Sequence, residues 1–339
     1  MRTTWARVSA HLSQSWAFYG EPIRHPAEIQ RTIGHATRSS ASKRALVARL
    51  RHLTRRPAGS APPPLVNGAL GLLGHPTEES RSWLVHTRPG SRRTIVHEID
   101  GSGSLRSVLK LGDATDERLK FEAMVIGSLD RQPESVHPSV IVPQLLGTAS
   151  DGSTYAMRTR LDLSDLVAPP YRWQPKTFDA AGSAIVALHR LLAEVPDMPF
   201  AQTETPTPGR PHRTGVSAGR PDMRDQWQEP LVPSHGDVTA WNLFLLGQDS
   251  RTRFAVIDFE ECALRPKWWD GSRLLATLWA EGRVTTPDLK HAAHAVSIVR
   301  PELIEYLTVQ CVPGRQEMAT QGRDRPLSRL AEVLRRQSW

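Results

Sequence analysis

Short runs of alternating apolar and polar residues begin at Ser82. Three of them, SWLVHT, RTIVHEI and LRSVLKL, are separated by the turn-rich connections RPGSR and DGSGS, a pattern typical of an antiparallel meander. DERLKFEAMVIGSL then has helical spacing, and VIVPQLLG and STYAMRTRL return to the strand-like pattern. Five strands and one helix within roughly 80 residues predict a small α+β lobe.

The pattern after residue 161 is mainly helical. FDAAGSAIVALHRLLAEV (residues 178–195) has apolar residues at helical spacing, and the Pro- and Gly-rich residues 196–223 that follow it are expected to form a loop. From Gly271 to the end, apolar helical patterns alternate with prolines. Between these parts lies RFAVIDF, whose apolar character predicts a buried strand.

The first 80 residues differ from the rest. ASKRALVARLRHLTRR places three leucines at helical spacing with basic residues between them, which predicts a basic amphipathic helix. PAGSAPPP then breaks the pattern, as a linker does. We therefore expect a basic, mainly helical extension at 1–80, a small strand-rich lobe at 81–160 and a larger lobe at 161–339.

The distribution of charge supports this division. The chain carries a formal charge of +8, and residues 1–80 contain eleven basic and four acidic residues, so nearly all of the positive excess lies in the extension. A solvated basic face explains this excess, and so does a surface that attracts an acidic partner. For such a partner we expect an acidic peptide or protein and not nucleic acid.

Composition excludes several other classes of protein. Cys262 and Cys311 are the only cysteines, too few for a disulfide framework or a cysteine metal cluster. No stretch approaches the roughly 18 consecutive apolar residues of a membrane span, and the N-terminal residues lack the continuous apolar core of a signal peptide. We expect a cytoplasmic protein without a membrane span.

The residues that carry chemistry lie in HGDVTAWN (235–242) and FAVIDFEE (254–261). Asp258 ends a strongly apolar run, where a carboxylate is costly unless a cation such as a divalent metal meets it. Asn242 offers a neutral oxygen for the same ion, and Asp237 remains available to accept or orient a proton. Together these groups suit the binding of a metal-nucleotide and the alignment of a hydroxyl with its terminal phosphate.

HGDVTAWN followed by VIDFEE resembles the catalytic loop and metal-binding motif of the aminoglycoside phosphotransferase and choline kinase-like family, which shares its fold with protein kinases. The resemblance covers roughly residues 82–278. It implies a bilobal α+β fold, with a five-stranded antiparallel sheet and one helix in the small lobe and a larger, mainly helical second lobe. It also implies ATP and Mg²⁺ as cofactors and a hydroxyl-bearing acceptor.

The resemblance assigns roles to residues of this chain. Asp237 is expected to be the catalytic base, His235 to brace its loop, and Asn242 and Asp258 to bind Mg²⁺. Lys110, in SVLKL, is expected to hold the inner phosphates of the nucleotide.

Three further assignments concern the small lobe. Glu122 is expected to position Lys110, with Glu117 as its rival. The adenine is expected against backbone groups of the lobe connection AMRTRL, which makes Arg158 and Arg160 candidate nucleotide-binding positions. The RPGSR connection either covers the phosphates or is a simple hairpin turn.

Departures from the protein kinase pattern narrow the function. HGD replaces HRD, Glu260 replaces the glycine of DFG, and only twelve positions separate Asp258 from Asp270, which leaves no room for a long activation loop. A phosphorylation-regulated protein kinase is therefore disfavoured. We expect phosphoryl transfer to a small molecule of the antibiotic, sugar or amino alcohol type. The alternatives are a Ser/Thr kinase for a peptide in natural-product biosynthesis and a non-catalytic scaffold that has kept the fold.

Overall fold

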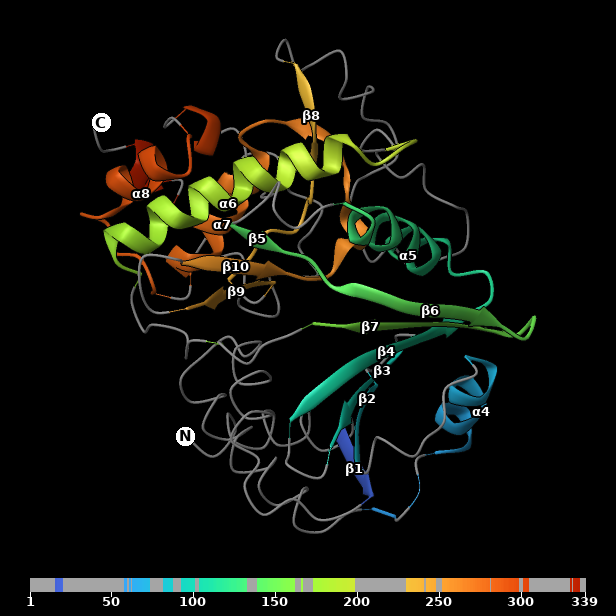
Figure 1. Cartoon of the computed structure of the whole chain (residues 1–339). Helices are drawn as coiled ribbons and strands as arrows, with labels where there is room; N and C mark the ends of the chain where they lie inside the picture. The colour runs from blue at the N-terminus through green and yellow to red at the C-terminus, as the bar shows by residue number, and fades with distance from the viewer. Residues whose placement is uncertain are drawn as a thin grey trace.

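The computed structural model of the chain forms two lobes of unequal size, a strand-rich lobe and a helix-rich lobe (Figure 1). It describes residues 16–20, 58–59, 61, 63–73, 82–87, 93–100, 104–132, 139–161, 166, 173–198, 230–240, 242–247, 252–280, 282–298, 301–304, 330 and 332–335. The basic helix predicted before residue 57, the RPGSR connection and most of the insert at 196–223 lie outside these ranges.

A six-stranded antiparallel sheet forms the small lobe, in the order β1-β2-β3-β4-β7-β6. Its strands are β1 (Trp16–Gly20), β2 (Ser82–Thr87), β3 (Thr94–Ile99), β4 (Leu105–Asp113), β6 (Gln144–Ser150) and β7 (Thr154–Arg160). The predicted meander is β2-β3-β4. The sheet has one strand more than the five predicted, because β1, from the first 80 residues, pairs with β2.

Helices cover the two faces of this sheet. On one face, α5 (Glu117–Asp130) places Leu119, Ala123 and Ile126 in a core shared with Met157 of β7. On the other face, α4 (Pro64–Leu72) packs Val66, Ala69 and Leu70 against alternate residues of the strands, Ala156 of β7 among them. Adjacent residues of a strand point to opposite faces, so only one side of each strand faces α5.

The predicted strand VIVPQLLG is divided between the lobes. Its start forms β5 (Val140–Ile141), which pairs in parallel with β10 (Arg253–Val256) of the large lobe. Its end forms β6 in the small-lobe sheet. Pro143 lies between the two parts, where a residue without a backbone N–H interrupts strand pairing.

The large lobe is built around α6 (Pro175–Ala193). Its buried residues recur at helical spacing and contribute to the main core. Gly182 allows close packing against α8 (Leu289–Ala295), because a Cβ at this position would lie 1.9 Å from the carbonyl oxygen of Ala295. The lobe also contains α7 (Trp269–Ala280), as the helical pattern after Gly271 predicts.

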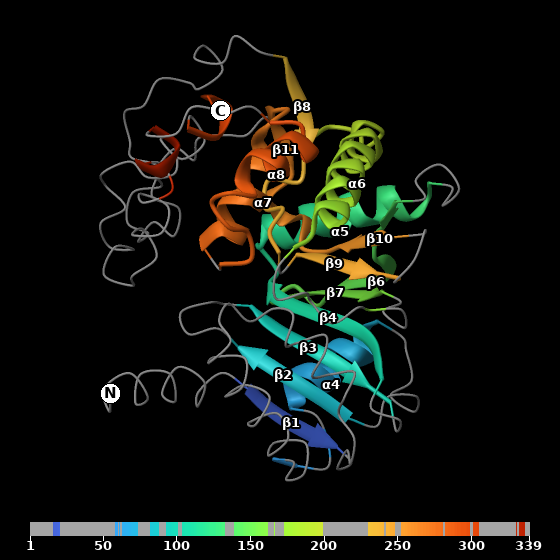
Figure 2. The same cartoon turned by 90° about the vertical axis from the view of Figure 1, so that its left-hand side faces the viewer.

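Two small antiparallel pairs bring the chemical residues of the large lobe to one edge. The first joins β8 (Leu231–Ser234) to β11 (Ala263–Pro266), and the second joins β9 (Leu243–Leu246) to β10. The short helix η4 (Phe259–Glu261) follows β10. Figure 2 shows α5 beside α6 and β10 of the large lobe and above the small-lobe sheet, and α5 is in contact with η4.

The architecture confirms the expected fold class, a bilobal α+β fold of the protein kinase type with a mainly helical second lobe. The boundaries at residues 80 and 160 remain a prediction, although β1 and α4 from the first range pack within the small lobe. None of the helices in the described ranges has the length and apolar character needed to cross a membrane.

Candidate active site

The HGDVTAWN segment connects β8 to β9, and its first residue is fully buried. The Nε2 atom of His235 donates to the carbonyl oxygen of Ile257 at 3.0 Å, and the backbone N–H of Asp237 donates to His235 Nδ1 at 3.3 Å. Both contacts fit the tautomer with its proton on Nε2. His235 thus ties the Asp237 loop to the residue that precedes Asp258, a geometry suited to the bracing role predicted for it.

The glycine of HGD has a steric cause. Gly236 has a φ of 81°, and a Cβ on it would lie 2.2 Å from the carbonyl oxygen of Glu261. A residue with a side chain is excluded here by both conformation and space. The arginine of the HRD motif therefore has no room in this loop.

Both oxygens of the Asp237 carboxylate have partners. The Nδ2 atom of Asn242 lies 3.0 Å from Oδ2 of Asp237 and 3.0 Å from its backbone oxygen. From α7, the Arg273 guanidinium donates to Oδ1 through Nε at 2.5 Å and also pairs through Nη2. Because the amide nitrogen of Asn242 faces Asp237, its amide oxygen is the atom suited to a cation.

Lys110 joins the two lobes. Its ammonium donates to both oxygens of Glu122, at 2.7 and 2.8 Å, and to Oδ1 of Asp258 at 2.8 Å. Burial alone would lower the pKa of Lys110, but the carboxylates of Asp258 and Glu122 outweigh burial and raise it. The ammonium therefore stays charged between the Glu122 and Asp258 carboxylates.

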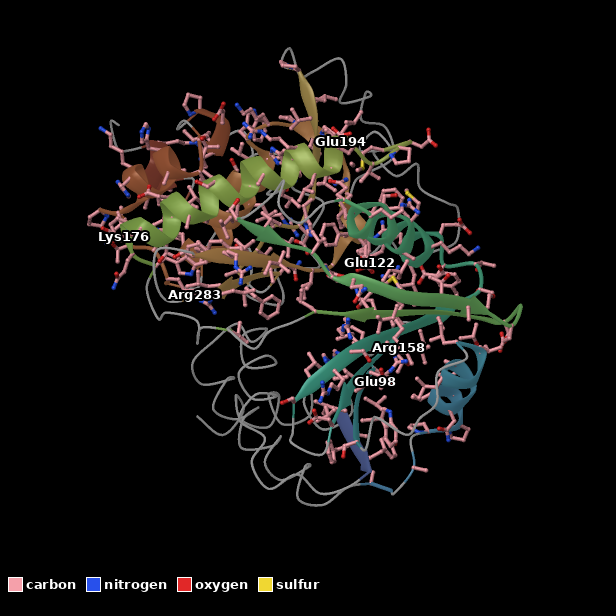
Figure 3. The ribbon with its side chains drawn as sticks, in the orientation of Figure 1. Glu98, Glu122, Arg158, Lys176, Glu194 and Arg283 are labelled. Atoms are coloured by element: carbon pink, nitrogen blue, oxygen red, sulfur yellow. The ribbon has the colours of Figure 1, made fainter. Side chains whose placement is uncertain are left out.

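Glu122, and not its rival Glu117, meets Lys110. Only 1% of the Glu122 side chain is exposed. The Glu117 side chain is 80% exposed and pairs with Lys120 on the helix surface. In Figure 3, Glu122 lies on the α5 side of the sheet.

The two metal-binding candidates, Asn242 and Asp258, lie on adjacent segments of the backbone. Asp258 follows β10 and adopts the left-handed conformation, with φ 72° and ψ 62°. The backbone N–H of Ile257, the residue before Asp258, donates to the backbone oxygen of Asn242 at 3.1 Å, so the chain segments that carry the two candidates lie side by side. A carboxylate and a carboxamide oxygen are hard donors of the kind that Mg²⁺ prefers.

These two donors leave most of a magnesium coordination shell to other ligands. Within the described ranges, no group of three His, Cys, Asp or Glu side chains is arranged to hold a metal. The pair therefore fits an ion that takes its remaining ligands from nucleotide phosphates and water, as Mg²⁺ does when it binds with a nucleotide.

Asp270 was not singled out from the sequence, although it organises the Asp237 loop. It is fully buried at the start of α7 and accepts hydrogen bonds from the backbone N–H groups of His235, at 2.9 Å, and Gly236, at 2.8 Å. His189 of α6 contacts it at 3.0 Å. A signal was present, since Asp270 directly follows two tryptophans at the start of an apolar helical pattern.

Arg158 and Arg160 are not brought to this cluster. Arg158 lies on the α4 side of the sheet, where its Nε contacts Glu98 at 2.7 Å and Ser107 at 3.2 Å. Figure 3 shows Arg158 beside Glu98 and across the sheet from Glu122. Arg160 is exposed and donates to Gln144 at 2.7 Å. The Arg158 side chain thus points away from Lys110, and the Arg160 side chain binds a residue of the neighbouring strand β6.

Comparison with known proteins identifies relatives at the level of the family. The model of the phosphotransferase enzyme family (APH) matches residues 88–306, well over half of the chain. This range contains all the chemical residues described above. A comparison with curated proteins gives no match.

Several solved structures are similar to the chain at low identity. An amicoumacin kinase in complex with AMP-PNP, Ca²⁺ and Ami is 13% identical, with a TM-score of 0.49 over 78% of this chain and 92% of that chain. An aminoglycoside phosphotransferase from Streptomyces rimosus is 16% identical, with a TM-score of 0.46 over 71% and 96%. A macrolide 2'-phosphotransferase from Brachybacterium faecium is 14% identical, with a TM-score of 0.41 over 75% and 95%.

Proposed function

The chain belongs to the phosphotransferase enzyme family, and from this we propose that it transfers the γ-phosphoryl group of ATP to a hydroxyl of a small molecule of the antibiotic, sugar or amino alcohol type. The observation that carries the proposal is an unbroken set of contacts. It runs from Lys110 to Asp258, then through Ile257 to Asn242 and Asp237. The groups proposed to bind the nucleotide and to accept the proton are thus neighbours in one cluster.

The small-lobe residues of the cluster would hold the nucleotide. Lys110 would bind the inner phosphates, and Glu122 would keep Lys110 in position. Asp258 and Asn242 would bind Mg²⁺, which offsets the negative charge of the transferred group. The ion pairs that Lys110 makes with Glu122 and Asp258 support these roles, because they place its ammonium between α5 and the metal-binding loop.

Asp237 would align the acceptor. As the acceptor oxygen bonds to the γ-phosphorus, the bond to the bridging oxygen breaks, ADP leaves with that electron pair, and the hydroxyl proton passes to Asp237. Arg273 and Asn242 fix the orientation of the Asp237 carboxylate from either side. Positioning and electrostatic stabilisation supply most of the rate in such a reaction.

The pairing of β7 limits which backbone groups of the lobe connection could bind adenine. Met157 pairs with Lys110 across the strands, so it lies on the face of β7 that the nucleotide would approach. Because β7 is paired on both sides as far as Thr159, its backbone groups up to that residue serve the sheet. We therefore propose that adenine is held by backbone groups at the end of the connection, at Arg160 and Leu161.

Two measurements on the purified chain test the proposal. The melting temperature should rise with MgATP and not with Mg²⁺ alone, because a ligand that binds only the folded state stabilises it. ADP release should then be measured against a panel of amino alcohols, sugars, hydroxyl-bearing antibiotics and acidic Ser- or Thr-containing peptides. An unchanged melting temperature would favour a non-catalytic scaffold, and turnover confined to peptides would overturn the small-molecule acceptor.

A further inference from the structure

Glu260 stands where the protein kinase motif has a glycine, and the small lobe holds its side chain. Arg93, the residue before β3, pairs through Nη1 with Oε2 of Glu260. The same guanidinium binds the Asp116 carboxylate at two points, Nε to Oδ2 at 2.5 Å and Nη2 to Oδ1 at 2.7 Å. Asp116 is the N-cap of α5 and accepts from the backbone N–H of Leu119. Arg93 thus joins the start of β3, the start of α5 and the metal-binding loop.

A second ion pair spans the same interface and provides a comparison. Arg118 of α5 contacts Glu261 at 3.0 Å, and these side chains are 42% and 33% exposed. Arg93 and Glu260 are 22% and 21% exposed. Water screens the outer pair more strongly, so it should contribute less. The loop therefore offers two adjacent carboxylates, each bound to an arginine of the small lobe but at different depth.

The loop between these contacts needs support. Asp258 has a left-handed backbone, a conformation that residues with a Cβ adopt only where neighbouring contacts hold it. Lys110 binds its side chain, and Arg93 binds Glu260 two residues later. Two cations of the small lobe thus hold the loop on either side of Phe259, which is fully buried.

The charge balance of this region also depends on Arg93. Four cations, Lys110, Arg93, Arg118 and Arg265, face five carboxylates contributed by Asp116, Glu122, Asp258, Glu260 and Glu261. Burial alone would raise the pKa of Asp116, but the hydrogen bond and charge of Arg93, together with backbone N–H groups of α5, outweigh burial and lower it.

We infer that Arg93 is a positioning residue of the phosphoryl-transfer site, which acts through Glu260 to hold Asp258 ready for a metal-bound nucleotide. The inference rests on the proposed function. It gives the Glu260 carboxylate the role of a clamp between the lobes, and not that of a metal ligand or an acceptor contact. Where the DFG motif has a flexible glycine, this chain thus has Glu260, which the small lobe holds through Arg93.

A pair of double-mutant cycles tests this inference, with calorimetric titration of the ATP analogue AMP-PNP as the readout. The first cycle uses Arg93→Ala, Glu260→Ala and their combination, and the matched cycle uses Arg118→Ala, Glu261→Ala and theirs. Each titration is run with Mg²⁺ and with EDTA. In the first cycle we expect each single variant to weaken Mg-AMP-PNP binding about tenfold, and the double variant to be no weaker than either single variant.

Comparing the loss of AMP-PNP affinity with and without Mg²⁺ distinguishes an effect on the metal ligand Asp258 from a general distortion of the nucleotide site. With EDTA, the variants of the first cycle should bind AMP-PNP within about twofold of the parent chain, and the matched cycle should stay within about twofold in both conditions. Equal losses with and without Mg²⁺, independent effects of Arg93 and Glu260, or equal losses in the two cycles would each overturn the clamp.

Folding and the proposed function are checked separately. If an alanine variant does not fold, Arg93→Gln and Glu260→Gln replace it, because they remove charge and keep most of the side-chain volume. Failure of the parent chain to bind Mg-AMP-PNP would refute the proposed function and the clamp together. Binding by the parent chain, with unchanged affinity in the first cycle, would refute the clamp alone.

Discussion

The two halves of the candidate active site are held by different kinds of contact. The half around Asp237 depends on hydrogen bonds to buried groups of its own lobe, above all those of Asp270 to the backbone of the loop. The half around Lys110 depends on ion pairs between lobes, whose partners are 148 residues apart for Lys110 and Asp258 and 167 apart for Arg93 and Glu260.

This difference separates what is preformed from what must be assembled. The large lobe can fix the orientation of Asp237 before a nucleotide arrives, because Asn242 and Arg273, the partners of that carboxylate in the described part of the chain, are its own residues. The position of Lys110 relative to Asp258 depends on how the lobes meet. We therefore expect changes in the first half to affect turnover or folding, and changes in the second half to affect nucleotide affinity.

The largest effect is expected from Asp237→Asn. The substitution removes the proton acceptor and keeps the shape, so turnover should fall by about 10²–10⁴-fold, while Mg-AMP-PNP affinity stays close to that of the parent chain. Asp179→Asn, on the exposed face of α6, is the matched control. Steady-state ADP release and calorimetry measure the two quantities. An Asp237→Asn enzyme that works at the parent rate would remove Asp237 from the mechanism.

Arg158→Met should affect folding and leave the site intact. It removes the cationic partner of Glu98, whose side chain is 1% exposed, and loss of one partner of a buried ion pair costs about 3–5 kcal/mol of unfolding free energy. Because Arg158 lies on the α4 face, Mg-AMP-PNP affinity should not change. Glu98→Gln in the same chain should restore much of the stability in denaturant titrations. A large loss of affinity in the folded single variant would return Arg158 to the nucleotide site.

Asp270→Asn should lower the unfolding free energy by about 2 kcal/mol at pH 7, because it weakens charge-assisted hydrogen bonds to His235 and Gly236. Burial alone would raise the pKa of Asp270, but its hydrogen bonds with His189 and with the backbone N–H of Gly236 lower it below the ordinary 3.8. A carboxyl with a lowered pKa stabilises the fold above its unfolded-state pKa and loses that contribution as pH falls through the folded-state pKa.

The difference between Asp270→Asn and the parent chain should therefore be constant from pH 7 to about 5 and shrink only below about 3.8. Chemical denaturation at a series of pH values measures it. A difference that grows on acidification would contradict the assignment of Asp270 as the ionised anchor of the loop.

Glu122→Gln and Glu117→Gln form the mildest comparison. Glu122→Gln should weaken Mg-AMP-PNP binding about tenfold, because Lys110 loses one of its two charged partners. Glu117→Gln should change both affinity and unfolding free energy by less than about 0.5 kcal/mol, since its ion pair with Lys120 is exposed. Equal effects on affinity would show that α5 acts as a whole and not through Glu122.

The same contrast explains how far the sequence could predict the site. Asp237, Asn242 and Asp258 lie within 22 positions of each other, so their order and apolar context were visible in one short segment. Lys110 and Glu122 were assigned from a resemblance and are indeed in contact. The roles predicted for all five residues remain predictions until they are measured.

Contacts between distant segments could not be predicted in the same way. Arg93 and Arg273 matter because of where the folded chain places them, and no local spacing distinguishes them from surface arginines. The extra strand β1 pairs with a strand more than 60 residues later. The orientation of the Arg158 side chain could have been predicted, because the alternation of a strand requires Met157 and Arg158 to face opposite sides.

The central claim is that Asp258 meets a metal-bound nucleotide beside Lys110, and calorimetric titration of Asp258→Asn with AMP-PNP tests it most directly. We expect the parent chain to bind one Mg-AMP-PNP and to bind AMP-PNP more weakly in EDTA. The variant should lose most of this gain from Mg²⁺ and remain folded. If Asp258→Asn retains the full gain in AMP-PNP affinity from Mg²⁺, or if the parent chain shows no binding, the cluster around Lys110 and Asp258 is not the phosphoryl-transfer site described here.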